Sequence, residues 1–448
     1  MLDDQLIGAL NEKIFSMAEL TQRFGVNQST LSRAIQRLEA RQVVVQFGKA
    51  RATRYAHIRS SAILPEPVLP VYAVDEQGEA QHLGSITAVS PHGYVVDLRD
   101  SSPLLQAGFF AGLPFYLQSL RPEGFLGRIM AKAAAEQVPG LVRDLQLWSD
   151  DAVLRFASLM GDDLPGAVIV GERAITRFLE SRPQPITEHN AAALEDLARR
   201  VESGEAPGSS AGGERPKFTA YLQDEQGRAY HAIVKFSSAG DNPVEARWRD
   251  LLVAEYLALQ TLQGAGLSAS PSRLHCQPNG RVFLAVERYD RIAAKGRRHY
   301  FSLGMIDHAL IGDFRHIRTS VTWLWQNKLL TREHCDEIIL TSLFGDLIGN
   351  TDQHFGNVSL GMTGGAFSLT PAYDVLPMWY APGSNGTLPA GRHSVPAILP
   401  EYRALSSRAQ QLACEFWQRV NADARISAEF RSVAAENLLA LKQGHNLC

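Results

Sequence analysis

The stretch LIGNTDQHFGNVSL, residues 347–360, with the later TPAYDV, residues 370–375, decides how the rest of the chain is interpreted. Asp352 precedes Asn357 by five positions, and Asp374 follows in the second motif. Phosphoryl transfer to a hydroxyl needs a carboxylate that accepts the hydroxyl proton and oxygen ligands that hold Mg²⁺ against nucleotide phosphates. Protein kinases supply these groups with a D-x-x-x-x-N loop and a later Asp. The spacing therefore predicts Asp352 as the base and Asn357 and Asp374 as Mg²⁺ ligands.

A plainer interpretation of the same letters is a polar turn between a helix and a strand. Asn, Asp and Gly gather in turns for local conformational reasons. Short motifs also have many chance matches. The rest of the chain weighs against the plain turn, because other groups typical of a kinase occur in a kinase's order.

Composition places the chain among globular proteins of several domains. It has 448 residues, 45% hydrophobic and 20% charged, which is too long for one ordinary core. The formal net charge of −3 excludes a surface wholly devoted to nucleic acid, so any DNA contact is local. Cys276, Cys335, Cys414 and Cys448 form no C-x-x-C pair, which excludes a zinc ribbon and a thioredoxin motif. Dispersed cysteines, an acidic start and the lack of a long apolar run predict a cytoplasmic protein without a membrane span.

Residues 1–60 predict a winged helix-turn-helix. Ser16 and Glu19 have the spacing of a capping box at the start of a short helix. Asn27 then caps a second helix with one apolar stripe, formed by Leu31, Ala34, Ile35 and Leu38. Two strand-like runs, residues 43–47 and 54–58, follow and would form the wing.

Polar and basic side chains on this module predict contact with duplex DNA. The polar face of the second helix resembles a recognition helix and carries Gln28, Ser29, Thr30, Ser32, Arg33 and Arg37. The wing adds Lys49, Arg51 and Arg54 for phosphate contact. Because one module gives a small interface, two copies on a two-fold site are expected, which predicts a homodimer. The alternative is a helical protein-docking module with a solvated basic face.

Residues 61–203 form a second predicted domain, in which no residue pattern indicates chemistry. ILPEPVLP is a Pro-rich connector, and PVYAVD and QHLGSITAV alternate like the strands of a hairpin around an EQG turn. Helical patterns cover residues 124–136, 149–160 and 188–201, and LPGAVIVG is a short buried strand. Asp150, Asp151, Asp162 and Asp163 fit helix caps and turns better than metal ligands.

Residues 204–300 predict an ATP-binding region. GEAPGSSAGGERPK, residues 204–217, could let backbone N–H groups approach phosphates, although a flexible linker has the same composition. The strand AIVKF carries Lys235, and a helix over residues 245–262 carries Glu255, which could pair with it as an αC glutamate does. AVERYDR, residues 285–291, is a strand leading into a hinge whose backbone could hold adenine.

Residues 301–448 predict a helical lobe that leads into the catalytic loop. Amphipathic patterns cover residues 302–310, 319–328 and 331–347, and the end of the chain from Pro400 is again mostly helical. VSL and AFSL flank GMTGG as a hairpin before Asp374. His354 lies within the catalytic loop and could position Asp352 by a hydrogen bond.

Taken in order, SAGGERPK, AIVKF, AVERYDR, LIGNTDQHFGN and LTPAYDV resemble the HipA family of bacterial serine/threonine kinases, which are the kinases of toxin–antitoxin modules. The resemblance covers about residues 70–448. It implies an α+β, multidomain protein with a bilobal kinase fold and a mainly helical C-terminal lobe, here behind the winged helix-turn-helix. It also implies ATP and Mg²⁺ as cofactors, a translation protein such as an aminoacyl-tRNA synthetase as substrate, and a HipB-like antitoxin as partner.

Carried over by motif, the resemblance assigns a role to each site residue. Asp352 is the base, Asn357 and Asp374 hold Mg²⁺, Lys235 contacts ATP, and Ser210 is the loop serine that becomes autophosphorylated. The remaining ATP-site residues are Gly212, Gly213, Glu214, Arg215, Pro216 and Lys217 in the phosphate loop, Glu287, Arg288 and Tyr289 at the hinge, and His354, Phe355, Gly356 and Tyr373 around the catalytic loop.

The chain departs from the family pattern at several places. Gly356 stands where the family often has a lysine, and Ser209 beside Ser210 leaves two candidates for the phosphosite. The segment after Asp374 is short for the family's helical lobe, which puts the substrate surface in doubt more than the ATP site. The family's DNA-binding part usually belongs to a separate antitoxin, whereas here it is fused to the kinase.

Two other functions compete with a kinase. One is a transcription regulator whose kinase-like body senses a nucleotide or another ligand. The other is a metal-dependent nuclease that uses Asp352, His354 and Asp374. The presence of Lys235 and Asn357 together with these carboxylates favours the kinase, because a degenerate sensor would tolerate a loss and a nuclease does not explain Lys235.

Overall fold

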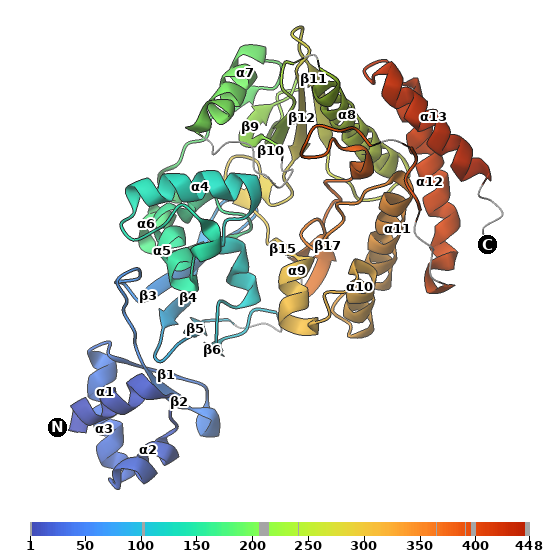
Figure 1. The fold of residues 1–448 in the computed structure, drawn as a ribbon. Coiled ribbons are helices and arrows are strands. Elements are labelled where there is room, and N and C mark those ends of the chain that lie inside the picture. Colours follow the sequence, from blue (N-terminus) through green and yellow to red (C-terminus); the bar gives the residue numbers. More distant parts are fainter. Residues whose placement is uncertain are drawn as a thin grey trace. The chain divides into compact units, whose positions relative to one another are not determined.

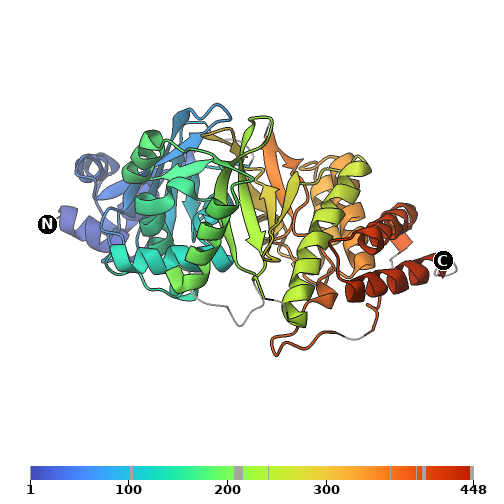
Figure 2. The same cartoon turned by 90° about the horizontal axis from the view of Figure 1, so that it is seen from above.

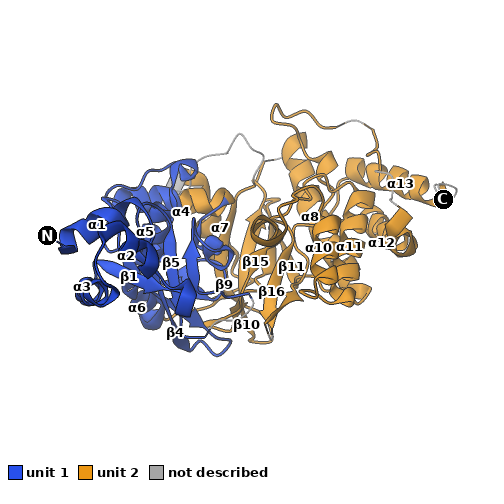
Figure 3. Ribbon diagram, turned by 90° about the horizontal axis from the view of Figure 1, so that it is seen from below, with its two compact units in different colours: residues 1–123, 130–181 blue, residues 124–129, 182–448 orange. Residues whose placement is uncertain are grey.

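The computed structural model describes residues 2–100, 104–205, 215–240, 242–363, 365–389, 391–395 and 400–443. The chain forms two compact units, residues 1–123 with 130–181 and residues 124–129 with 182–448 (Figure 3). Within the described ranges, no helix is long and apolar enough to cross a lipid bilayer.

The N-terminal part of the first unit consists of three helices and a two-stranded hairpin. They are α1 (Leu2–Glu12), α2 (Met17–Phe24), α3 (Gln28–Ala40), β1 (Val44–Phe47), the 3-10 turn η1 (Ala50–Ala52) and β2 (Arg54–His57). The predicted capping box at Ser16 and Glu19 is present. All four predicted stripe residues of α3 are buried, because this face of α3 packs into one core with α1 and α2. No prediction covered α1, whose Leu6, Ala9 and Leu10 complete that core.

The rest of the first unit is built on a five-stranded antiparallel sheet. In spatial order the strands are β6 (Gly108–Phe110), β5 (Tyr94–Leu98), β4 (Ala80–Ala88), β3 (Val68–Val74) and β7 (Val168–Val170). The helical segments are η2 (Phe115–Leu120), η3 (Leu145–Leu147), α5 (Asp150–Met160), η4 (Gly161–Asp163) and α6 (Glu172–Glu180), while α4 (Gly124–Gln137) crosses the division between the units. Strands β3 and β4 are the predicted hairpin, and α5 begins after its cap residue, Ser149.

A charged cluster joins the N-terminal hairpin to this sheet. Ile58 forms a bridge with Val89, and the next residue, Arg59, donates two hydrogen bonds from its guanidinium to Asp151, at 2.6 and 3.0 Å. The same carboxylate accepts the hydroxyls of Ser61 at 3.0 Å and Tyr94 at 2.6 Å. We call Arg59, Ser61, Tyr94 and Asp151 the Asp151 cluster.

The second unit contains another five-stranded sheet. Its strands, in spatial order, are β11 (Ser272–Cys276), β12 (Val282–Glu287), β10 (Ala229–Phe236), β9 (Lys217–Gln223) and β8 (Ile186–Thr187). Burial alternates along β10, so one face packs with α7 (Ala191–Arg200) and the other presents Lys235 to α8 (Pro243–Gly264). Helix α7 begins later than predicted because Asn190 caps it, while Glu188 accepts the buried Tyr230 hydroxyl at 2.5 Å.

Helices form most of the remaining second unit. They are η5 (Val201–Glu205), α9 (Leu303–Ile306), the π-helix η6 (Asp307–Ile311), α10 (Ile317–Gln326), α11 (Arg332–Ile348), η7 (Met378–Tyr380), η8 (Pro400–Tyr402), α12 (Arg403–Ala422) and α13 (Ala428–Gln443). Short strands lie between them: β13 (Arg291–Ile292), β14 (Gly296–Arg297), β15 (Phe301–Ser302), β16 (Ser359–Thr363) and β17 (Ala366–Leu369). Helix α12 packs against α11, α13 and α8 (Figures 1 and 2). This bundle packs around α11, and the predicted catalytic loop starts at the end of this helix.

Candidate active site

The centre of the candidate active site is an ion cluster of three side chains from three segments. Lys235 lies on β10, Glu255 on α8, and Asp374 follows β17. The Lys235 Nζ donates to both carboxylate oxygens of Glu255, at 2.6 and 2.7 Å, and also contacts Asp374 Oδ1. The predicted Lys235–Glu255 pair is therefore present, and Asp374 joins it. We call these three residues the Lys235 cluster.

Opposite charges decide how this cluster ionises. Burial works against the charged form of Lys235, but the carboxylates of Asp374 and Glu255 outweigh it and raise the pKa of the amine. Burial raises the pKa of Glu255. For Asp374, the ammonium groups of Lys235 and Lys217 prevail over burial and lower the pKa. Lys235 and Asp374 are thus charged at neutral pH, as the binding of phosphate and of a cation requires.

The backbone at Asp374 has a conformation that residues with side chains rarely adopt. Its φ is 54°, in the left-handed region. The Asn350 Nδ2 donates to the Asp374 carbonyl at 3.3 Å, and the preceding Tyr373 donates its hydroxyl to the Gly356 carbonyl at 2.9 Å. Such strain costs about 1–3 kcal/mol and is concentrated at functional sites. The Asp374 side chain is 33% exposed, so it remains accessible to a ligand.

The predicted catalytic loop begins where α11 ends. Gly349 terminates the helix with φ 82°, which is a left-handed cap. The Asp352 N–H donates to Asn350 Oδ1 at 3.3 Å, and Asn357 Nδ2 donates to the Asp352 carbonyl at 2.9 Å. This leaves Asn357 Oδ1 as the oxygen that can face a cation. Asp352 lies at the surface, yet the surrounding protein removes enough water from its carboxyl to raise the pKa.

His354 makes its ring hydrogen bond to Gly356 rather than to Asp352, where we expected it. Its Nδ1 accepts the Gly356 N–H at 3.0 Å, and a Cβ at Gly356 would come within 2.9 Å of the ring. A larger residue at Gly356 would therefore require the His354 ring to move away from this position. His354 remains close enough to Asp352 and Asp374 for a protonated ring to oppose the effect of burial on both carboxyls.

A further anchor ties the loop to α11 and was missed by sequence reasoning. The Gln353 Nε2 donates to Asp346 Oδ1 at 2.9 Å, and Arg318 contacts the other oxygen of that carboxylate. Gly345 makes room for this anchor, because a Cβ there would meet the Gln353 side chain at 2.7 Å. The anchor crosses the end of a helix, where the direction of the chain changes, so no spacing rule would have paired Gln353 with Asp346.

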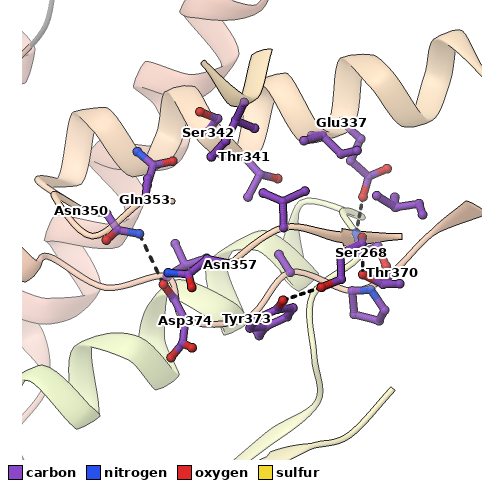
Figure 4. A pocket seen from close by; sticks show the side chains of 18 residues that line it. Ser268, Glu337, Thr341, Ser342, Asn350, Gln353, Asn357, Thr370, Tyr373 and Asp374 are labelled. Carbon is purple, nitrogen blue, oxygen red and sulfur yellow. Dashed lines mark hydrogen bonds between the residues drawn. The ribbon is translucent and has the colours of Figure 1, made fainter. Parts of the chain in front are cut away.

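A pocket lies between α11 and residues 369–375, next to the catalytic loop (Figure 4). Asn357 and Asp374 line it together with Ser268, Glu337 and several other residues. The Ser268 N–H donates to the Glu337 carboxylate, and this hydrogen bond joins two residues that line the pocket. The two predicted Mg²⁺ ligands thus reach the same cavity.

The predicted hinge residues are engaged with other parts of the protein. Glu287 ends β12, and its carboxylate accepts two hydrogen bonds from Arg228, at 2.9 and 2.8 Å. The Arg288 guanidinium pairs with the Asp290 carboxylate at 3.0 Å, and the backbone N–H of Arg288 donates to the His231 carbonyl at 2.9 Å. The Tyr289 hydroxyl packs over Gly361, where a Cβ would lie only 2.4 Å from it. The residues of the predicted hinge thus contact β10, β16 and the residues around them.

The predicted phosphate loop is only partly described. Lys217 of β9 lies opposite Lys235 of β10 in the sheet, and both ammonium groups act on Asp374. The guanidinium of Arg215 lies 4.1 Å from the centroid of the Trp248 ring, and Pro216 follows it in the sequence, directly before β9. The predicted residues Ser209, Ser210, Gly212, Gly213 and Glu214 lie outside the described residues.

The predicted DNA-binding residues occupy α3 and the hairpin of the first unit. On α3, Gln28, Ser29, Arg33 and Arg37 are exposed, whereas Thr30 and Ser32 are partly buried. Arg37 pairs with Asp3 at 2.7 Å. Lys49 and Arg51 are exposed on the hairpin, while Arg54 donates to the carbonyls of Arg51 and Thr53. Within the described structure, Arg33, Lys49 and Arg51 are therefore the cations of this set that remain available to a ligand.

Known proteins share this architecture. A family model described as the HipA-like C-terminal domain matches residues 209–438, and one described as the YjjJ-like toxin, middle domain, matches residues 66–179. The Toxin YjjJ of Escherichia coli (strain K12) is 37% identical over 424 residues, which cover 94% of this chain and 93% of that protein. A chain of the solved complex of HipA, HipB and operator DNA from Shewanella oneidensis MR-1 has a TM-score of 0.54 at 15% identity, covering 83% of this chain and 95% of that one. At this identity, the likeness concerns the fold alone.

Proposed function

The chain belongs to the HipA-like toxin family, and we propose that it is an ATP- and Mg²⁺-dependent serine/threonine protein kinase of toxin type, which arrests growth by phosphorylating a protein of translation. The observation that carries the proposal is the Lys235 cluster beside the loop that bears Asp352. Lys235, Asn357 and Asp374 supply the ammonium and the oxygen atoms that a nucleotide with Mg²⁺ needs. Bound ATP supplies the phosphoryl group.

Each residue has a task that its surroundings support. Lys235 holds phosphate oxygens, because its raised pKa keeps it charged. Glu255 positions Lys235 through two hydrogen bonds. Asn357 and Asp374 hold the cation, and Asp352 accepts the proton of a serine or threonine hydroxyl. The raised pKa of Asp352 makes its carboxylate a better base than an ordinary aspartate.

Transfer of labelled phosphate from ATP tests this proposal. The full-length protein is incubated with Mg²⁺, labelled ATP and a fraction of translation proteins that includes aminoacyl-tRNA synthetases. Asp352→Asn should abolish transfer and keep the calorimetric affinity for an ATP analogue, because this residue is not a cation ligand. Asp336→Asn is the matched control, since that carboxylate lies on the same helical lobe and pairs with Arg332. Transfer that persists in Asp352→Asn, or that is absent from the wild type, would contradict the proposal.

Ser210 is the proposed site of autophosphorylation. A phosphate in this loop adds about −1.5 to −2 charges near the place of the ATP phosphates, so repulsion should switch the kinase off. Intact-mass measurement after incubation with Mg²⁺ and ATP should show one added phosphate that is absent from Ser210→Ala. Persistence in Ser210→Ala with loss in Ser209→Ala would move the site by one residue.

The N-terminal helices and hairpin are proposed to form a winged helix-turn-helix that binds duplex DNA as a homodimer and regulates the protein's own promoter. The support is the exposure of Arg33 on α3 and of Lys49 and Arg51 on the hairpin. The Shewanella relative was solved with HipB and operator DNA, so a HipB-like antitoxin is a further proposed partner. Anisotropy titration of the full-length protein with fragments of that promoter tests the idea. No binding at low salt would favour the protein-docking alternative.

A further inference from the structure

Phe314 has a backbone conformation that a bulky side chain rarely adopts. Its φ is 49°, in the left-handed region, and the residue is 49% exposed. An aromatic residue in this region is an outlier, because its Cβ crowds the backbone. The reversal of the chain after η6 does not require an aromatic residue, since Gly312 already adopts the left-handed conformation two residues earlier, with φ 73°.

A buried carboxylate holds this strained turn in place. Asp307 is fully buried, and its Oδ1 accepts the N–H groups of Asp313 at 3.0 Å and Phe314 at 3.1 Å. Its other oxygen accepts the Ser320 hydroxyl, and its carbonyl accepts the Gly312 N–H at 2.7 Å. Because a buried carboxylate needs these donors, the position of Phe314 is fixed by the fold.

The Phe314 ring lies against the catalytic loop. Its centroid is 5.6 Å from that of Phe355, and the rings are tilted by 53°. Phe355 lies three positions after Asp352, and its carbonyl accepts the Gly304 N–H at 3.2 Å. The His308 ring supports Phe314 at 6.0 Å. A half-exposed aromatic ring on a strained backbone is thus held against the loop that bears the residue that would accept the hydroxyl proton.

The geometry points to Phe314 as a specificity-determining residue, which forms with Phe355 an aromatic shelf for a large apolar side chain of the protein substrate. This inference rests on the proposed kinase function and names its substrate class, a polypeptide with an apolar residue near the acceptor serine or threonine. Strained residues that the surrounding structure holds in place are concentrated at binding and catalytic sites. Phe355 lies in the same loop as Asp352, three residues after it, and the acceptor hydroxyl must reach this loop, whereas the phosphates belong at Lys235.

A positional-scanning peptide library tests the shelf. Each peptide carries one serine or threonine and one fixed flanking residue, and the full-length protein is supplied with Mg²⁺ and labelled ATP. The wild type should select Phe, Leu or Met at one flanking position. Phe314→Ala should lower the ratio of kcat/KM between peptides with and without that residue about tenfold, mainly through KM for the peptide. Phe314→Leu should restore part of the ratio, and Phe314→Gly, which relieves the backbone strain, should behave like Phe314→Ala.

Phe109→Ala is the matched control, because Phe109 is an exposed aromatic residue of the first unit, at 37%. It should leave the selectivity ratio unchanged. A wild type without apolar selection, or a selection that survives in Phe314→Ala, would overturn the shelf. Autophosphorylation without phosphorylation of any library peptide would also overturn it and leave the kinase standing. Absence of all phosphoryl transfer would instead remove the kinase proposal, and the shelf with it.

Discussion

Each compact unit places a carboxylate against a cation, but the two arrangements differ in how far their hydrogen-bonding positions are filled. In the first unit, Asp151 is 8% exposed and accepts four hydrogen bonds, two of them from Arg59. In the second unit, Lys235 lies between Glu255 and Asp374, and the Asp374 side chain is 33% exposed on a strained backbone.

The difference separates a structural role from a functional one. A carboxylate offers about four lone-pair positions, so the Asp151 cluster has none left for a ligand. The Lys235 cluster joins one ammonium to two carboxylates, and the Asp374 side chain keeps exposed surface that is available to a ligand. Filled polar clusters stabilise a fold, whereas unfilled and strained ones indicate a binding site.

Asp374→Asn should have the largest effect, because it removes a charge from the unfilled cluster and keeps its volume. Phosphoryl transfer should fall about a thousandfold. Calorimetric affinity for an ATP analogue in the presence of Mg²⁺ should weaken, since a cation ligand loses its charge. The melting temperature should change little, because Lys235 keeps Glu255. Unchanged nucleotide affinity would show that Asp374 does not hold the cation.

Asp151→Ala should act on stability instead. The free energy of unfolding should fall by about 2–4 kcal/mol, because the guanidinium of Arg59 and the hydroxyl of Tyr94 lose a buried acceptor. Urea denaturation measures this loss, and phosphoryl transfer per folded molecule should not change. Glu136→Ala is the control, since its pair with Arg143 is exposed and 3.5 Å long. A loss of transfer without a loss of stability would reverse the assignment of the two clusters.

The stability that Asp151 contributes should also depend on pH. Burial acts to raise the pKa of Asp151, but the bonds from Arg59 and Tyr94 outweigh it and lower the pKa. A lowered pKa in the folded state means that the contribution is present above the ordinary carboxyl value and is lost as the pH falls through the lowered one. Asp151→Ala should therefore lack this part of the wild-type acid sensitivity.

A pH profile sharpens the contrast within the active site. The pKa of Asp352 is raised by burial, whereas the pKa of Asp374 is lowered by Lys235 and Lys217 despite burial. As the pH falls, the base should therefore be protonated before the cation ligand. Below the raised pKa of Asp352, kcat/KM should fall about tenfold per pH unit while analogue affinity persists. Parallel loss of both would contradict these separate roles.

Local patterns were sufficient to predict several parts of the fold and of the site. The α3 stripe and the β3–β4 hairpin follow from the periodicity of apolar residues, and the structure has both. The Lys235–Glu255 pair was predicted because a strand lysine followed by a helix glutamate resembles the ion pair of protein kinases, and the structure has this pair.

Contacts between distant segments could not be predicted from local sequence patterns. Asp374 meets Lys235 across 139 positions, and Asp151 meets Arg59 across 92. We interpreted Asp151 as a helix-cap or turn residue, which fits its place in the first turn of α5, but that place says nothing of a partner on another segment. No residue pattern indicates that Phe314 has a left-handed backbone, because the cause is the buried Asp307.

The smallest effects are expected for two arginines of the N-terminal hairpin. One of them makes hydrogen bonds within the protein, and the other is exposed. Arg54 donates to the carbonyls of Arg51 and Thr53, whereas the side chain of Arg51 is exposed. If the hairpin contacts phosphates, Arg51→Ala should weaken DNA binding several-fold on every sequence. The slope of the logarithm of the binding constant against the logarithm of the salt concentration should become smaller in magnitude by about one. Arg54→Ala should change affinity less and should lower the melting temperature, because the loop loses its internal donors. Anisotropy titrations at several salt concentrations compare the two variants. A larger loss of affinity in Arg54→Ala would mean that its internal bonds are exchanged for phosphate contacts when DNA binds.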